Sequence, residues 1–120
     1  MEADDRVYEL YTAGRALLRG GDNAGAIDRL VAARDLAPTK GSIREALALA
    51  YLRAGQLIDA EAELTVALDL APNDAYTYYL LGRAQLGLGF VDLARGSFKM
   101  AHWLEPASDT YRGALQRLTA

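Results

Sequence analysis

Few side chains in this sequence have the chemistry of a catalytic or metal site. The only histidine is His102 and there is no cysteine, so a histidine-pair or thiolate metal site is absent and a Ser/His/Asp triad would have to use His102. We interpret His102 as a helix residue near a C-terminus. Residues 87–89 are Gly-Leu-Gly and lack the third glycine of a phosphate loop. We predict that Glu61 and Glu63 lie on the solvated face of a helix. The sequence therefore predicts no enzyme, no metal and no cofactor.

Tyrosine and arginine carry a stronger signal, and it is one of binding. Two triplets with the order Tyr, Tyr, Arg have the spacing i, i+3, i+7: Tyr8, Tyr11 and Arg15, and Tyr76, Tyr79 and Arg83. On a helix this spacing puts the three side chains on one face. Tyrosine and arginine are enriched among the residues that dominate binding energy at interfaces. The triplets therefore favour contact with a ligand.

Composition and charge describe one ordinary globular domain. The 120 residues are 52% hydrophobic and 24% charged, as expected of a chain that buries a single core. A net charge of −3 argues against nucleic acid and anionic membranes as partners. The N-terminus is acidic and lacks the apolar run of a signal peptide, and no stretch of about 18 apolar residues occurs. We therefore expect a cytoplasmic protein.

The prolines reveal an internal period. Pro38, Pro72 and Pro106 lie 34 residues apart, and each closes a similar phrase. A fixed period of this length indicates stacked supersecondary units. Aligned on the prolines, the chain divides into a short lead-in 1–6, units 7–40, 41–74 and 75–108, and a remnant 109–120.

Small residues recur at fixed places in each unit. Alanine stands at unit positions 20 and 27, glycine at position 15, and glycine or alanine at position 8. Each unit also holds two apolar-periodic stretches, separated by a glycine turn and closed by the proline. The pattern predicts two paired helices in every unit, with the small residues where the helices approach closely.

In its length and recurring small residues, the unit resembles the tetratricopeptide repeat, whose pattern is W-x2-L-G-x2-Y, then A-x3-F, then A and P. The resemblance covers about residues 7–106. It implies an all-α, right-handed superhelical solenoid of about seven helices, with 109–120 as a C-terminal capping helix. Such solenoids present extended concave surfaces, so the resemblance also implies a protein-binding module or adaptor.

Local sequence predicts how several helices begin and how the last one packs. Ser42 and Glu45 have the spacing of a capping box at the start of the second unit. Asn73 or Asp74 is expected to cap the next helix, and Ser108 the helix of the remnant. In that last helix we expect Ala114, Leu115 and Leu118 to cover the third unit while Arg112, Gln116 and Arg117 face water.

The resemblance also implies where a ligand would bind. In this family the first helix of each unit lines a concave face, mainly through unit positions 2, 5, 9, 12 and 13. Carried onto this sequence, the expected peptide-binding groove consists of Tyr8, Tyr11, Arg15, Arg19, Leu49, Leu52, Arg53, Tyr76, Tyr79, Arg83 and Leu86. The leucines can instead close the core, and the Tyr/Arg triplets can be structural stacks between units. As a binding face, the groove suits a peptide or helix with acidic and apolar residues.

Some members of the family hold a C-terminal carboxylate with Lys at position 5, Asn at positions 6 and 9, and Lys or Arg in the third unit. The first unit has Tyr11, Thr12 and Arg15 at these positions, and the second has Ala46 at position 6. We therefore expect no carboxylate clamp of that type.

A second surface offers an alternative function. The outer row of the third unit carries Phe90, Val91, Met100 and Trp103, where the first unit has Asp22, Asn23, Ala32 and Asp35. An exposed apolar patch of this kind favours a self-associating scaffold, for example a homodimer. The other interpretation is that the capping helix partly covers the patch.

Overall fold

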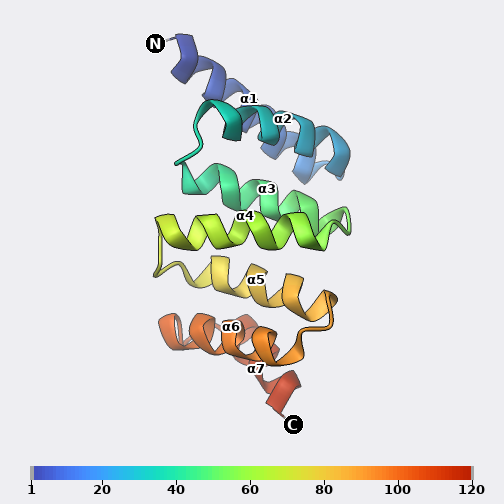
Figure 1. Cartoon of the computed structure of the whole chain (residues 1–120), viewed down its shortest axis with the longest axis vertical. Coiled ribbons are helices and arrows are strands. Elements are labelled where there is room, and N and C mark those ends of the chain that lie inside the picture. The colour runs from blue at the N-terminus through green and yellow to red at the C-terminus, as the bar shows by residue number, and fades with distance from the viewer. Residues whose placement is uncertain (1, 120) are drawn as a thin grey trace.

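The chain folds into seven helices that are stacked in sequence order (Figure 1). The computed structural model describes residues 2–119, and this part of the chain contains no strand. The helices are α1 (Glu2–Arg19), α2 (Asn23–Leu36), α3 (Gly41–Arg53), α4 (Leu57–Leu70), α5 (Ala75–Gly87), α6 (Val91–Leu104) and α7 (Asp109–Thr119). The predicted all-α solenoid of seven helices is confirmed.

Each helix packs mainly on its neighbours in the sequence, which gives an elongated molecule of 50 × 25 × 21 Å. The three antiparallel pairs are α1 with α2, α3 with α4, and α5 with α6 (Figure 1). In addition, α3 contacts both α1 and α5. The first helices of the pairs are therefore neighbours along one face of the solenoid, and the second helices form the other layer.

Glycine makes the reversal inside each pair possible. Gly21, Gly55 and Gly89 have φ angles of 88°, 77° and 87°, in the left-handed region that other residues rarely adopt. All three stand at unit position 15, so the predicted glycine turns are confirmed. Directly after the first turn, Asp22 caps α2, because its Oδ1 accepts a hydrogen bond of 2.9 Å from the N–H of Gly25.

Two of the predicted helix caps are confirmed and the predicted capping box is wrong. Asp74 and Ser108 accept hydrogen bonds from backbone N–H groups in the first turns of α5 and α7. In α3 the N-cap residue is Lys40, and no side chain accepts a capping hydrogen bond. Ser42 lies within the helix, and Glu45 bonds a residue of the next repeat instead of its own helix start.

In the first and third repeats the two helices of a pair are in close contact at one small residue. Gly14 of α1 faces Leu30 of α2, and a Cβ added to Gly14 would lie only 2.7 Å from the Leu30 Cγ. Gly82 faces the ring of Phe98 at a still shorter distance, and the middle repeat has Ala48 in this place. A larger side chain at these positions would force the facing residue to move. The spacing of the helix pairs therefore depends on unit position 8.

The prediction for Glu63 is wrong. We expected a solvated carboxylate on α4, but Glu63 is only 6% exposed. Its two oxygens accept hydrogen bonds from Arg34 (2.5 Å) and Arg44 (2.9 Å), and Arg44 also donates to the carbonyl of Pro38. Two guanidiniums compensate for removing this carboxylate from water. The cluster joins α2, α3 and α4 across the junction of the first two repeats.

The ends of the solenoid are both helical. Residues 2–6, which we expected as a lead-in, belong to α1. At the other end, α7 packs on α6 through the buried side chains of Tyr111 and Ala114. Arg95 of α6 donates a hydrogen bond of 3.0 Å to the carbonyl of Leu118 and so holds the end of α7. As predicted, the apolar side of α7 covers the third repeat.

Ala60 tests the close contact between helices. It stands at unit position 20 and is completely buried between α3, α4 and α5. Ala60→Leu is expected to lower the free energy of unfolding by about 1–3 kcal/mol, because the added atoms overfill the core. Ala62→Leu, at an exposed position of the same helix, is expected to change it by less than about 0.5 kcal/mol. Urea unfolding followed by circular dichroism measures both. Equal stability of the two variants would contradict the repeat alignment.

Candidate binding groove

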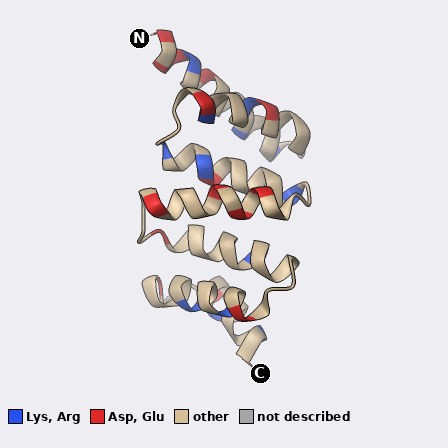
Figure 2. Ribbon diagram, in the orientation of Figure 1, with Lys and Arg blue, Asp and Glu red and all other residues tan. Residues whose placement is uncertain are grey.

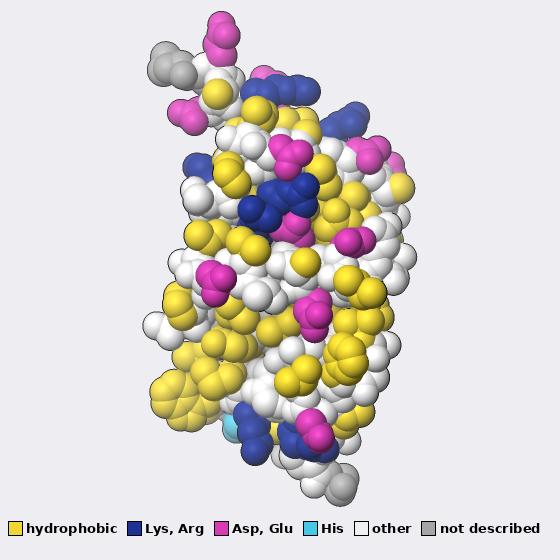
Figure 3. Space-filling view, viewed as in Figure 1, with side chains coloured by type: hydrophobic (Ala, Val, Ile, Leu, Met, Phe, Trp, Pro, Cys, Tyr) yellow, Lys and Arg dark blue, Asp and Glu magenta, His cyan; other side chains and the backbone are white. Residues whose placement is uncertain are grey.

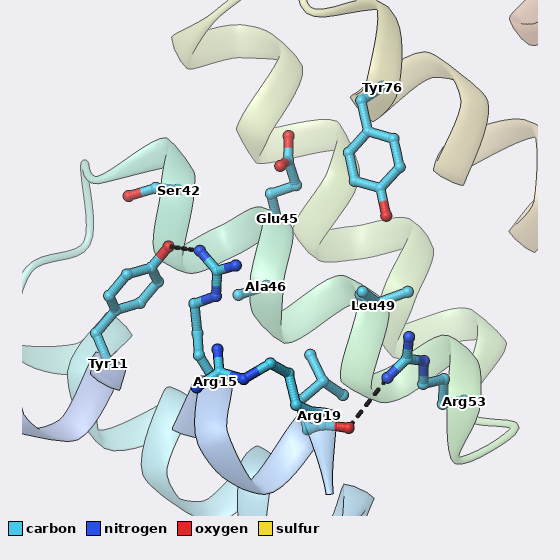
Figure 4. Close-up of a pocket in the computed structure, with 10 residues that line it drawn as sticks. Tyr11, Arg15, Arg19, Ser42, Glu45, Ala46, Leu49, Arg53 and Tyr76 are labelled. Carbon is cyan, nitrogen blue, oxygen red and sulfur yellow. Dashed lines mark hydrogen bonds between the residues drawn. The ribbon is translucent and has the colours of Figure 1, made fainter. Parts of the chain in front are cut away.

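The face formed by α1, α3, α5 and α7, which we call the groove, is hollowed between its helices. One hollow of about 280 Å³ lies between α1, α3 and α5 (Figure 4). Its lining residues are Tyr11, Arg15, Leu18, Arg19, Ser42, Glu45, Ala46, Leu49, Arg53 and Tyr76. Another of about 190 Å³ lies where α5, α6 and α7 meet. It is lined by Tyr79, Arg83, Leu86, Phe98, Ala114, Arg117 and Leu118. We call these the first and the second hollow.

Tyrosine and arginine stack within single helices of the groove. The Nη1 of Arg15 donates a hydrogen bond of 3.0 Å to the Tyr11 hydroxyl, and the Arg15 Cζ lies 5.6 Å from the Tyr11 ring centre. The Cζ of Arg83 lies 5.8 Å from the ring centre of Tyr79. Both are contacts between residues four apart, so the stacks that we considered between units form inside α1 and α5. Stacking orients each guanidinium and leaves most of its N–H groups available to a ligand.

Three guanidiniums and one carboxylate set the charge of the first hollow. Arg15, Arg19 and Arg53 line it together with Glu45. Arg53 donates a hydrogen bond of 3.1 Å to the carbonyl of Leu18, which fixes it across the junction of α1 and α3 (Figure 4). Among the described residues, no carboxylate forms a salt bridge with these three arginines. The first hollow therefore presents net positive charge.

Glu45 is half-buried in the wall of the first hollow, between α3 and α5. Its Oε2 accepts a hydrogen bond of 2.9 Å from the hydroxyl of Thr77. Burial raises the pKa of Glu45 to about 7, and the nearby carboxyl of Asp74 adds to the rise, while Thr77 and Arg15 oppose it. Glu45 therefore changes its charge near neutral pH, and the charge of the first hollow changes with it.

Tyr79 has a mainly structural place in the second hollow. Its ring centre lies 5.3 Å from that of Tyr111, 5.9 Å from that of Phe98 and 6.3 Å from that of Tyr76. Aromatic pairs at these distances attract one another beyond their simple burial. The cluster ties α5 to α6 and α7, and within its triplet Tyr79 is half-buried while Tyr76 and Arg83 are exposed.

The remaining predicted groove residues differ in exposure. Leu49 lines the first hollow and Leu86, 41% exposed, lines the second. Leu52 is half-buried against the core of α3, α4 and α5 and lines neither hollow, so it closes the core. Leu18, which is outside the predicted set, lines the first hollow and is buried. Tyr8 is 70% exposed and reaches a further hollow between α1 and α3.

The sequence-based groove prediction lacks Arg117, which lines a hollow, and Thr77, which supports a side chain of one. We expected Arg117 only to face water, but it lines the second hollow. If the remnant is numbered as a fourth unit, Arg117 falls at position 9, which is the position of Arg15 and Arg83. Extending the repeat numbering would therefore have found it. The hydrogen bond from Thr77 to Glu45 cannot be predicted from the repeat numbering, because the two residues belong to different repeats.

Nine of the eleven arginines fall into two groups, and the other two, Arg6 and Arg29, line neither hollow and form no salt bridge among the described residues. Those in salt bridges line neither hollow and are Arg34, Arg44, Arg95 and Arg112. Those that line the two hollows form no salt bridge among the described residues and are Arg15, Arg19, Arg53, Arg83 and Arg117. Figure 2 shows the scarcity of charge on α5, where Arg83 is the one charged residue. The groove thus offers cations that the rest of the structure leaves without an anion.

The apolar row on α6 is exposed. Trp103 is 75% exposed, Phe90 48%, Val91 41% and Met100 37%. Figure 3 shows hydrophobic side chains gathered at the lower left, over the end of α6. Leu115 of α7 reaches the edge of a hollow beside Trp103 and leaves most of the row uncovered.

The residues that we examined for catalysis lie in ordinary structural places. His102 is half-buried near the end of α6, and residues 87–89 comprise the last residue of α5 and the turn that leads to α6. Within residues 2–119, no group of three or more His, Asp or Glu side chains is arranged to hold a metal ion. No helix in the same range has the length and apolar character needed to cross a bilayer.

Glu45→Gln tests the titration of the groove. The pKa of Glu45 is near 4.5 in the unfolded chain and about 7 in the folded protein. Between these two pH values the folded protein holds a proton at Glu45 that the unfolded chain has lost. The free energy of unfolding of wild type therefore falls as the pH rises from about 4.5 to about 7. Gln is neutral at every pH, so the variant does not have this loss. The free energy of unfolding of Glu45→Gln minus that of wild type should therefore rise by about 1 kcal/mol between about pH 5 and pH 8, a value that allows for solvent screening. Urea unfolding measures this. Glu61→Gln removes the same charge from α4 and serves as the control for a change in net charge. A Glu45→Gln curve parallel to wild type would contradict the assignment.

Comparison with known proteins supports the fold. No protein-family model and no curated protein sequence matches the chain. The first tetratricopeptide-repeat (TPR) domain of Spaghetti (RPAP3) is similar, with a TM-score of 0.92 at 22% identity over 96% of this chain and 91% of that chain. The TPR domain of Arabidopsis OM64 has a TM-score of 0.92 at 24% identity, covering 95% and 94%. The second TPR domain of human RPAP3 has a TM-score of 0.92 at 19% identity, covering 98% of both chains. With its three helix pairs and α7, the chain has the tetratricopeptide-repeat fold, composed of three repeats and a C-terminal capping helix.

Proposed function

We propose that the chain is a protein-interaction module, not an enzyme, and that its groove binds a partner peptide or helix carrying acidic and apolar residues. The observation that carries this proposal is the row of exposed groove arginines without a carboxylate partner. Such guanidiniums can form charge-assisted, bidentate hydrogen bonds with a carboxylate. Tyr76 and Leu86, both partly exposed beside them, supply apolar contact area.

The ligands of the similar structures have a matching composition. The Spaghetti domain is bound to the HSP90 peptide SRMEEVD, and the human RPAP3 domain to the HSP70 peptide SGPTIEEVD. Both peptides combine Glu and Asp with Met, Ile or Val. This supports the chemical class of ligand proposed here. Since the identities are 22% and 19%, we transfer only that class and no particular partner.

We infer that the acidic groups of the ligand are side chains of an internal segment. The family's carboxylate clamp needs lysine and asparagine at places that hold Tyr11, Thr12 and Arg15 here. The cations of this groove are instead spread over four helices, from Arg15 in α1 to Arg117 in α7. A row of separated cations suits several carboxylates along a segment better than the single carboxylate of a chain end.

Fluorescence anisotropy with labelled peptides tests this function. The probes are SRMEEVD, an amidated peptide of alternating Glu and Leu, and its Gln counterpart. We expect the amidated acidic peptide to bind, the Gln counterpart to bind at least about tenfold more weakly, and salt to weaken the acidic peptide. Tyr11→Ala/Arg83→Glu should lose at least about tenfold in affinity, because interface hot spots are worth about 2 kcal/mol or more.

Arg29→Glu is the matched control, since Arg29 is exposed on α2 and lines neither hollow. It should stay within about twofold of wild type. If the groove variant also stays within about twofold, the groove is not the site. Equal losses in both variants would indicate a response to net charge alone. Binding of SRMEEVD that disappears on amidation would point to the chain end instead of acidic side chains.

The affinity for the acidic peptide should also depend on pH through Glu45. Below about pH 7 its carboxyl is protonated and neutral, and above that value it adds a negative charge to the first hollow. The amidated acidic peptide should therefore bind more tightly at about pH 6 than at pH 8, and Glu45→Gln should remove most of this difference. An unchanged pH dependence in Glu45→Gln would show that Glu45 does not face the ligand.

A further inference from the structure

The outer side of α6 carries an apolar stripe that the described part of the chain leaves uncovered. The stripe has the spacing i, i+3, i+7, i+10 and consists of Leu93, Gly96, Met100 and Trp103. This spacing puts all four on one side of the helix, opposite the side that packs on α5 and α7. Leu93 is 58% exposed and Trp103 75%. Phe90 and Val91 add exposed apolar surface at the start of the helix.

The stripe is specific to the third repeat. Trp103 occupies the place of Asp35 in α2 and Asp69 in α4. Gly96 occupies the place of Asp28 in α2, and Leu93 that of Asp59 in α4. The solenoid therefore does not need apolar residues at these places, since it forms with charged ones. An exposed tryptophan among other apolar side chains is typical of a surface that another protein covers.

Gly96 marks the centre of that surface. It lies in the middle of α6, it is exposed, and a Cβ added to it would meet no atom within 4 Å. Glycine weakens a helix relative to alanine, and nothing in the fold requires it at this position. A missing side chain does, however, let a second helix backbone approach closely, as Gly14 and Gly82 allow inside the first and third repeats.

The apolar residues are arranged evenly about this centre. Leu93 stands three residues before Gly96 and Met100 four residues after it, and Phe90 and Trp103 stand six before and seven after. If two copies of α6 cross antiparallel at Gly96, Leu93 meets Met100 of the second copy and Phe90 meets Trp103 of the second copy. Such self-complementarity is what a two-fold symmetric interface requires.

The charges beside the stripe agree with the same crossing. Asp92 stands four residues before Gly96 and Lys99 three residues after it. The antiparallel crossing therefore brings Asp92 next to Lys99 of the second copy, and this opposite-charge contact occurs twice. The Asp92 side chain is 96% exposed, and its hydrogen bond with Arg95 leaves its second oxygen free. Opposite charges at the rim of an interface favour the correct register over alternatives.

We propose that the chain forms a homodimer in which α6 packs antiparallel on α6 of a second copy, with the two helices crossing at Gly96. The groove lies on α1, α3, α5 and α7, so both grooves stay open in this dimer. A partner with two acidic segments would then bind both grooves and gain from the raised effective concentration.

Site-directed disulfide formation tests the crossing, because the chain has no cysteine of its own. In Gly96→Cys the two thiols meet at the symmetry axis, within the separation of about 7 Å between Cα atoms that a disulfide allows. We expect mild oxidation to convert Gly96→Cys into a disulfide-linked dimer at least about tenfold faster than Asp28→Cys. Asp28 is the matched control, since it is exposed at the equivalent place in α2. Equal rates would overturn the proposal.

Sedimentation equilibrium tests the dimer without a cross-link. Wild type should show a monomer–dimer equilibrium, and Trp103→Asp, which copies the residue of the other repeats, should weaken it at least about tenfold. Asp92→Lys and Lys99→Asp should each weaken the dimer, and their combination should restore it. Circular dichroism confirms that each variant is folded. A wild type that stays monomeric at every concentration, or a combined variant that associates no better than the single ones, would contradict pairing with a second copy.

Discussion

The structure depends on the close contact of two helices at a residue with almost no side chain. Gly14, Ala48 and Gly82 hold this place in the three repeats, and in the outer two Leu30 and Phe98 fill the space that the glycine leaves. This contact sets how far the helices of a pair stand apart, and stacking the pairs then aligns their first helices on one face. In α7 the same place is held by an exposed glutamine, Gln116, so α7 cannot receive a second helix in this manner. The groove exists because this one contact is repeated.

The stacking of the repeats also determines which charged residues are paired and which are exposed. Where the repeats meet at their cores, Glu63 is buried and needs both Arg34 and Arg44, because an unpaired carboxylate there would be costly. In the groove the arginines are exposed to solvent, so they need no internal carboxylate. Glu45 stands between these cases, half-buried and with a raised pKa. The charged residues at the junctions are therefore paired with one another, as the stability of the fold requires. The arginines of the groove form no salt bridge among the described residues and remain available to a ligand.

Much of the fold is predictable from the sequence, because proline and glycine act locally. The period of the prolines and the glycines at position 15 determine where helices end, and seven helices follow. The site is less predictable. The partners of Glu63 and Glu45 lie on other helices, and Tyr79, which looks like a free groove residue, is drawn into a cluster with Tyr111 and Phe98. Such contacts join residues whose proximity appears only once the repeats are stacked.

The most direct test of the central claim, that exposed unpaired arginines recognise an acidic segment, is NMR of the arginine Nε–Hε groups during titration with an amidated Glu/Leu peptide. The signals of Arg15, Arg53 and Arg83 should shift in a saturable way, and those of Arg34 and Arg44 should stay in place. Backbone shifts should concentrate on α1, α3, α5 and α7. Shifts confined to α2, α4 and α6, or groove arginine signals that do not move while the peptide binds, would contradict the account.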